Sequence, residues 1–99
     1  MRVSFVQIIE FRSGNIDAMQ EVAERWEKAT AGKRTAGRRL LCRDHQDANR
    51  FFNVVFFDSY ESAMQNSNLP ETQQLSQEMM KLADGPATFY DLDVVDDRS

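Results

Sequence analysis

Short apolar segments alternate along this chain with longer segments in which apolar residues recur at helical spacing. The short segments are rich in β-branched and aromatic residues, as strands are, and they lie at 3–11, 38–45, 51–57 and 88–95. A polar cluster separates the second segment from the third, which predicts a hairpin. The resulting order is strand, helix, strand, strand, helix, strand.

The first helix is predicted over 16–30, where apolar residues recur every three or four positions and form one stripe. Asn15 precedes this segment as a candidate N-cap. Trp26 lies on the apolar stripe, so we expect it in the core.

The second helical region is predicted to be interrupted. A short piece covers 60–65, and the polar triplet 66–68 breaks its pattern. Pro70 can then begin a second piece, because its missing N–H costs nothing at the first helical position. Asp58, followed three residues later by Glu61, suits a capping box at the start of the first piece.

This order of elements is the ferredoxin-like βαββαβ arrangement, an α+β fold. The connection rules put both helices on one face of a four-stranded antiparallel sheet, with the strands in the spatial order fourth, first, third, second. The length favours a single domain over 1–95. Residues 96–99 are expected to form a flexible tail.

The two faces of this sheet differ in polarity, because alternate residues of a strand point to opposite sides. One parity is almost uniformly apolar and is predicted to face the helices: Val6, Ile8, Leu40, Cys42, Phe52, Val54, Phe56, Tyr90, Leu92 and Val94. The other parity mixes apolar and polar residues: Phe5, Gln7, Ile9, Phe11, Arg39, Leu41, Arg43, His45, Phe51, Asn53, Val55, Phe57, Phe89 and Asp91.

The mixed face is predicted to be covered by a second copy of the chain. Left in water it would form an apolar patch larger than the few hundred Å² that a monomer normally exposes. A two-fold partner presenting the same face would bury it. The sequence therefore predicts a homodimer joined through the sheet face.

Six residues of the mixed face are candidates for binding a small apolar or aromatic ligand: Gln7, Arg39, Asn53, Phe57, Phe89 and Asp91. A few convergent polar groups with aromatic walls are typical of a ligand pocket. The alternative is that the polar groups satisfy one another at the dimer interface.

The catalytic residues are unknown from the sequence, and three residues are candidates. His45 is the only histidine and could act as a general base, although a solvated histidine beside a hairpin turn is the more common outcome. Asn53 could orient a substrate, and Tyr90 could donate a proton, although its parity favours burial. Cys42 is predicted to be a small buried hydrophobic residue rather than a nucleophile.

Composition narrows the classes of partner and site. The net charge of −4 argues against nucleic acid or an anionic membrane as the main partner. With one cysteine, no intrachain disulfide or paired-cysteine metal site can form. There is no Gly-rich phosphate loop or HxxxH pair, and we expect no metal and no cofactor. Neither a secretory signal nor a membrane-spanning run is seen, so the expected location is cytoplasmic.

Four segments carry a resemblance to a known family: 14–19, 58–63, 83–86 and 89–95. They resemble the dimeric α+β barrel superfamily, and within it the antibiotic biosynthesis monooxygenase-like group. The resemblance implies two ferredoxin-like protomers joined through their sheets, each with a cavity between sheet and helices in many members. If the cavity lies there in this chain, Tyr90, Cys42 and Trp26 gain weight over the mixed-face residues as lining.

The resemblance also bears on the reaction. Some members oxygenate polycyclic aromatic substrates without metal or flavin, and others degrade haem with an Asn, a Trp and a His. The nearest positions here hold Gln7, Phe57 and the segment 66–68, which contains no histidine, so haem degradation is not expected. The leading hypothesis is a cofactor-independent monooxygenase acting on a small aromatic or quinone-like substrate. The alternatives are a non-catalytic homodimer that binds a small molecule and a structural protein without a ligand.

Overall fold

The structure is a computed structural model that describes residues 3–98. It contains one four-stranded sheet in the order β2-β3-β1-β4, with every neighbouring pair antiparallel. The strands are β1 (Phe5–Arg12), β2 (Arg39–Asp44), β3 (Asp47–Phe57) and β4 (Thr88–Asp93). This confirms the strand order and the ferredoxin-like α+β fold predicted from the sequence. The predicted tail includes Ser99, which lies outside the described residues.

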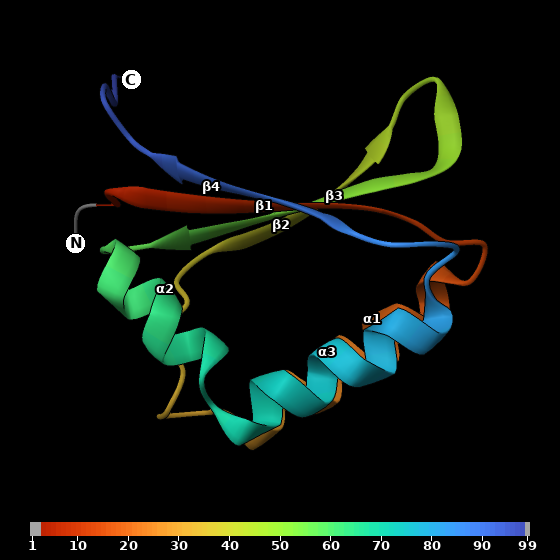
Figure 1. Cartoon of the computed structure of the whole chain (residues 1–99), viewed down its shortest axis with the longest axis horizontal. Helices are drawn as coiled ribbons and strands as arrows, with labels where there is room; N and C mark the ends of the chain where they lie inside the picture. Colours follow the sequence, from red (N-terminus) through yellow and green to blue (C-terminus); the bar gives the residue numbers. More distant parts are fainter. Residues whose placement is uncertain (1–2, 99) are drawn as a thin grey trace.

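All three helices lie on one side of the sheet (Figure 1). They are α1 (Ile16–Ala29), α2 (Tyr60–Ser67) and α3 (Pro70–Leu82). The predicted interruption of the second helical region is confirmed, but it comes later than expected: α2 continues to Ser67 with Asn68 as its C-cap, and α3 begins at Pro70. Figure 1 also shows that the β2–β3 hairpin bends away from the helices.

The predicted helix starts are partly wrong. Asn15 precedes α1 as expected, but its side chain makes no capping hydrogen bond. The N-cap of α2 is Ser59 rather than Asp58, and its hydroxyl accepts a hydrogen bond from the backbone N–H of Ser62. The backbone of Ser59 is extended, which is the conformation typical of an N-cap residue.

The core occupies the mixed face, so the predicted assignment of the two faces is wrong. One buried cluster joins Phe5, Val55 and Phe57 to Ala63 of α2. The other joins Phe11 and Phe51 to Met19 of α1. The large aromatic rings at the two ends of the mixed parity fill the space under the helices, and the polar residues of that parity lie between these ends.

The uniformly apolar parity therefore faces away from the helices, and we call this surface the open face: Val6, Ile8, Leu40, Cys42, Phe52, Val54, Phe56, Tyr90, Leu92 and Val94. Leu40, Tyr90 and Leu92 are 37–44% exposed. Cys42 is also exposed, which corrects the prediction that it is a buried hydrophobe. Uniform apolarity indicates that a face is to be covered, but it does not indicate by what.

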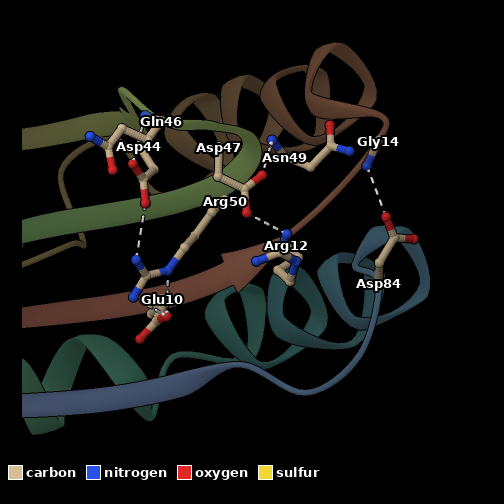
Figure 2. Close-up of polar contacts among 9 residues, drawn as sticks. All are labelled: Glu10, Arg12, Gly14, Asp44, Gln46, Asp47, Asn49, Arg50 and Asp84. Atoms are coloured by element: carbon tan, nitrogen blue, oxygen red, sulfur yellow. Dashed lines mark hydrogen bonds and ion pairs between the residues drawn. The ribbon is translucent and has the colours of Figure 1, made fainter.

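Turns at one end of the molecule tie the helical layer to the sheet. The Ser13 hydroxyl donates to the backbone carbonyl of Leu82 over 3.0 Å. The Asp84 carboxylate accepts from the backbone N–H of Gly14 over 3.0 Å, as Figure 2 shows. These contacts join the turn before α1 to the turn after α3, and so they fix where both helices leave the sheet.

Candidate functional site

A strip of polar and aromatic side chains crosses the middle of the helix-facing side of the sheet. We define this central strip as Gln7, Arg39, Asn53, Phe89 and Asp91. It comes from all four strands and lies between the two buried clusters. Its members are half-buried or exposed, although they lie on the helix-facing side. The helices therefore cover the inner strands β1 and β3, where Gln7 and Asn53 are half-buried, more completely than the edge strands β2 and β4, where the other members are exposed.

Strand register sets the strip out in two neighbouring rows. Asn53 and Phe89 both lie opposite Ile9 of β1. Gln7 and Arg39 both lie opposite Val55, and Asp91 pairs with Gln7 from the other side. One row thus carries an amide among apolar neighbours, and the other carries an amide, a cation and a carboxylate.

Hydrogen bonds link the polar side chains within the strip. Gln7 Nε2 donates to Asp91 Oδ1 over 3.0 Å. Arg39 Nη1 donates to Asn53 Oδ1 over 3.3 Å. Arg39 also approaches Glu27 of α1, with 3.6 Å between Nη2 and Oε1, so a helix holds the guanidinium from the other layer. Glu27 was not among the candidates, because its helical spacing marks it only as a charged residue off the apolar stripe.

The aromatic residues considered for the site lie in different places. Phe89 is 57% exposed, although its register opposite Ile9 places its side chain on the helix side. Trp26 is half-buried rather than part of the core as predicted, because it lies between α1 and α3, where its Nε1–H donates to the Thr72 hydroxyl over 3.0 Å. Phe57 is 2% exposed and packs in a buried cluster, so it supports the strip from one end.

Two catalytic candidates lie away from the strip. His45 is exposed in the turn between β2 and β3, the hairpin that bends away from the helices (Figure 1). Tyr90 belongs to the open face, where its hydroxyl donates to Glu10 Oε1 over 3.1 Å. Of the three candidates, only Asn53 belongs to the strip. The implied alternative lining of Tyr90, Cys42 and Trp26 is likewise divided, since only Trp26 is on the helix side.

A charged cluster occupies the hairpin end of the open face (Figure 2). Arg50 contacts Glu10 over 2.7 Å and Asp44 over 3.0 Å, and its guanidinium lies 4.8 Å from the centre of the Phe52 ring. The hydrogen bond from Arg50 holds the pKa of Glu10 below its ordinary value. The hydrogen bond to Glu10 raises the pKa of Tyr90. Arg50 pairs with both carboxylates of this cluster, which borders the apolar surface rather than the central strip.

The described residues offer little that would hold a metal. No group of three or more His, Cys, Asp or Glu side chains within residues 3–98 is placed to ligate an ion. Likewise, no helix in this range is long and apolar enough to cross a membrane. The polar groups of the strip are amides, one guanidinium and one carboxylate, a set suited to hydrogen bonding with an organic ligand.

Solved structures with this fold include three from bacteria. SnoaB, a cofactor-independent oxygenase from Streptomyces nogalater, is 11% identical and aligns over 97% of both chains with a TM-score of 0.80. A protein from Nitrosomonas europaea, proposed to be an antibiotic biosynthesis monooxygenase, is 10% identical over 96% of this chain and 94% of its own, with a TM-score of 0.77. Rv0793 from Mycobacterium tuberculosis is 12% identical over 96% of this chain and 98% of its own, also at 0.77.

These likenesses confirm the resemblance drawn from the sequence at the level of the fold. The chain has the fold of the antibiotic biosynthesis monooxygenase-like proteins. No family model matches the chain, and no curated protein matches its sequence. The activity therefore has to be argued from the residues of the site.

Proposed function

We propose that this protein is a cofactor-independent monooxygenase that binds a small aromatic or quinone-like substrate against the central strip. The observation that carries the proposal is the strip itself, where two amides, a guanidinium and an open aromatic ring share one half-covered surface. Apolar walls with a few fixed polar groups suit a flat aromatic molecule that carries oxygen atoms. The fold shared with SnoaB, a cofactor-independent oxygenase, supports the same reading.

The polar groups would act on the negative charge that forms when such a substrate loses a proton. Preorganised donors aimed at a developing oxyanion stabilise the transition state most. Asn53 and Arg39 supply the donors, while Phe89 supports the ring system. For an anthrone, the substrate enolate reduces O₂, one oxygen atom becomes the new carbonyl of the anthraquinone, and the other leaves as water with the two hydrogens of the methylene group.

We infer that the working unit is a homodimer joined through the open face. This differs from the face predicted from the sequence, since the mixed face is covered by the helices of the same chain. The open face lines up apolar residues from all four strands, and Val54 lies at its centre between Ile8 and Leu40. A second copy presenting the same surface would bury it with two-fold symmetry.

The second candidate function is a non-catalytic homodimer that binds a small molecule. The observation that favours it is that the polar side chains of the strip pair with one another, so no free general base stands within it. In that case the ligand is held and not converted.

Oxygen uptake with anthrone as substrate tests the proposed activity. We expect one O₂ consumed per anthraquinone formed, above the spontaneous rate. Asn53→Leu should lower kcat by roughly a hundredfold, the usual cost of losing one oxyanion donor. Gln20→Leu, at an exposed position of α1, is the matched control and should retain activity.

A wild-type rate equal to the spontaneous rate would refute the oxygenase. Anthraquinone that raises the melting temperature without turnover would then support the binding alternative, because a ligand of the folded state stabilises it.

A further inference from the structure

The two amides of the central strip each face a fully charged partner. Asn53 meets the Arg39 guanidinium, and Gln7 meets the Asp91 carboxylate. A guanidinium can only donate hydrogen bonds, and a carboxylate can only accept them. Asn53 must therefore turn its oxygen toward Arg39, and Gln7 must turn its nitrogen toward Asp91. Flipping either amide would set donor against donor or acceptor against acceptor.

This arrangement leaves one group of each amide free for a ligand. Within residues 3–98, neither Asn53 Nδ2 nor Gln7 Oε1 has a hydrogen-bond partner. Neither atom is among the buried polar atoms that lack a partner, so both stay within reach of solvent. The strip thus offers one fixed donor, at Asn53, and one fixed acceptor, at Gln7.

The two free groups are spaced so that one flat molecule could meet both. Asn53 lies opposite Ile9, and Gln7 lies opposite Val55, so the two residues are diagonal neighbours on the β1–β3 pair. Diagonal neighbours on one face of a sheet are separated by roughly 7–8 Å. A fused aromatic ring system can lie across that distance, with Phe89 beside it in the same row as Asn53.

We propose that the strip selects an aromatic ligand by the positions of its oxygen atoms: a carbonyl or oxyanion oxygen at Asn53 and a hydroxyl group at Gln7. The ligand class is a hydroxylated aryl ketone or quinone. Arg39 and Asp91 are positioning residues, because each acts through the amide it holds. Glu27 of α1 holds Arg39 in place and so acts on Asn53 through Arg39. The proposal rests on the proposed function for the location of the site, but it requires binding only.

The selection can be measured as the ratio of the affinities for a hydroxylated ligand and for an analogue without the hydroxyl group. A site built to hydrogen-bond a hydroxyl group rejects an analogue that lacks it, because the polar group of the site is left unpaired. The strip is only half-buried, so water can replace part of the lost contact. We therefore expect a preference of about tenfold, the equivalent of one net hydrogen bond.

Equilibrium binding of anthraflavic acid, a dihydroxyanthraquinone, and of its dimethyl ether tests the proposal. Quenching of Trp26, the single tryptophan, reports the binding. The wild-type protein should bind the dihydroxy compound about tenfold more tightly. Gln7→Met should abolish this preference. Asn53→Asp keeps the contact with Arg39 but replaces the free donor with an acceptor. The affinity for both compounds should therefore fall by about tenfold or more.

Two further variants separate positioning from general damage to the fold. Glu27→Gln should weaken the binding of both quinones while leaving the melting temperature of the free protein within about a degree of wild type, since an exposed ion pair contributes little to stability. Gln20→Met, outside the strip, should keep both the affinity and the preference.

The outcomes are distinct. A Gln7→Met protein that retains the tenfold preference would overturn the proposal, as would an Asn53→Asp protein that binds like wild type. Failure of the wild-type protein to bind either quinone would overturn it as well. Selective binding without oxygen uptake would support the proposal and refute the oxygenase activity alone.

Discussion

Arg50 pairs with the two carboxylates at the hairpin end of the open face. Its guanidinium joins Glu10 of β1 to Asp44 of β2 and covers the ring of Phe52. Backbone and side-chain hydrogen bonds from Gln46 and Arg50 hold the pKa of Asp44 below its ordinary value. Both carboxylates therefore stay ionised beside an apolar surface, where unpaired charges would be costly.

Tyr90 should report this cluster in a pH titration. Its hydroxyl donates to the Glu10 carboxylate, which favours the neutral phenol and raises its pKa above the ordinary value. The contact thus stabilises the fold below about pH 10, the ordinary pKa of tyrosine, and is lost as the pH rises through the higher folded value. Replacing Glu10 by Gln should return the Tyr90 pKa toward about 10.

Absorbance at the tyrosinate band measures this, with Tyr90→Phe used to identify the contribution of Tyr90. Glu24→Gln, an exposed change on α1, is the control and should leave the curve unchanged. Identical titrations of the wild-type and Glu10→Gln proteins would contradict the contact.

At the scale of elements, the sequence predicted the order and the breaks well because they have local causes. Pro70 begins a helix, and Gly85 takes a positive φ of 101° just before β4. The assignment of sheet faces failed because it depends on what lies across the sheet. Alternation correctly grouped Gln7, Asn53 and Asp91 on one face, but the apolar content of that face could not say whether helices or a second copy cover it.

The two helix starts give a matched test of capping. Ser59→Ala removes the side chain that accepts from Ser62, so it should lower the free energy of unfolding by about 1 kcal/mol. Asn15→Ala should cost much less, because the Asn15 side chain makes no capping hydrogen bond. Urea denaturation followed by circular dichroism compares the two. Equal losses of stability would contradict the observed caps.

For the whole molecule, the decisive feature is that a sheet with helices on one side only leaves an apolar surface on the other. The helical layer buries Phe5, Phe11 and Phe51 on the mixed face, and no helix of residues 3–98 lies over Val54 and its neighbours on the open face (Figure 1). The inferred homodimer follows from this asymmetry.

Val54→Asp should break the homodimer. A carboxylate at the centre of the open face would be buried without a partner, so the dimer dissociation constant should rise by at least about a hundredfold. Sedimentation equilibrium on the 11.4 kDa chain measures it, and circular dichroism checks that the variant folds.

Met80→Asp is the control, because Met80 is 74% exposed on α3 and should leave the dimer intact. A wild-type protein that sediments as a monomer would refute the inferred assembly.

The pairing of β1 with β4 has a consequence for how the protein is made. Phe5 is among the first residues of the described chain to be synthesised, yet it pairs with Asp93, which is among the last. One edge of β1 therefore stays without hydrogen-bond partners until translation of this region is nearly complete, and closing so long a loop is entropically unfavourable. Since Tyr90 and Leu92 also belong to the open face, the complete contact surface forms only once β4 has been synthesised and has paired with β1. Assembly of two copies is therefore expected to follow the pairing of β4 with β1.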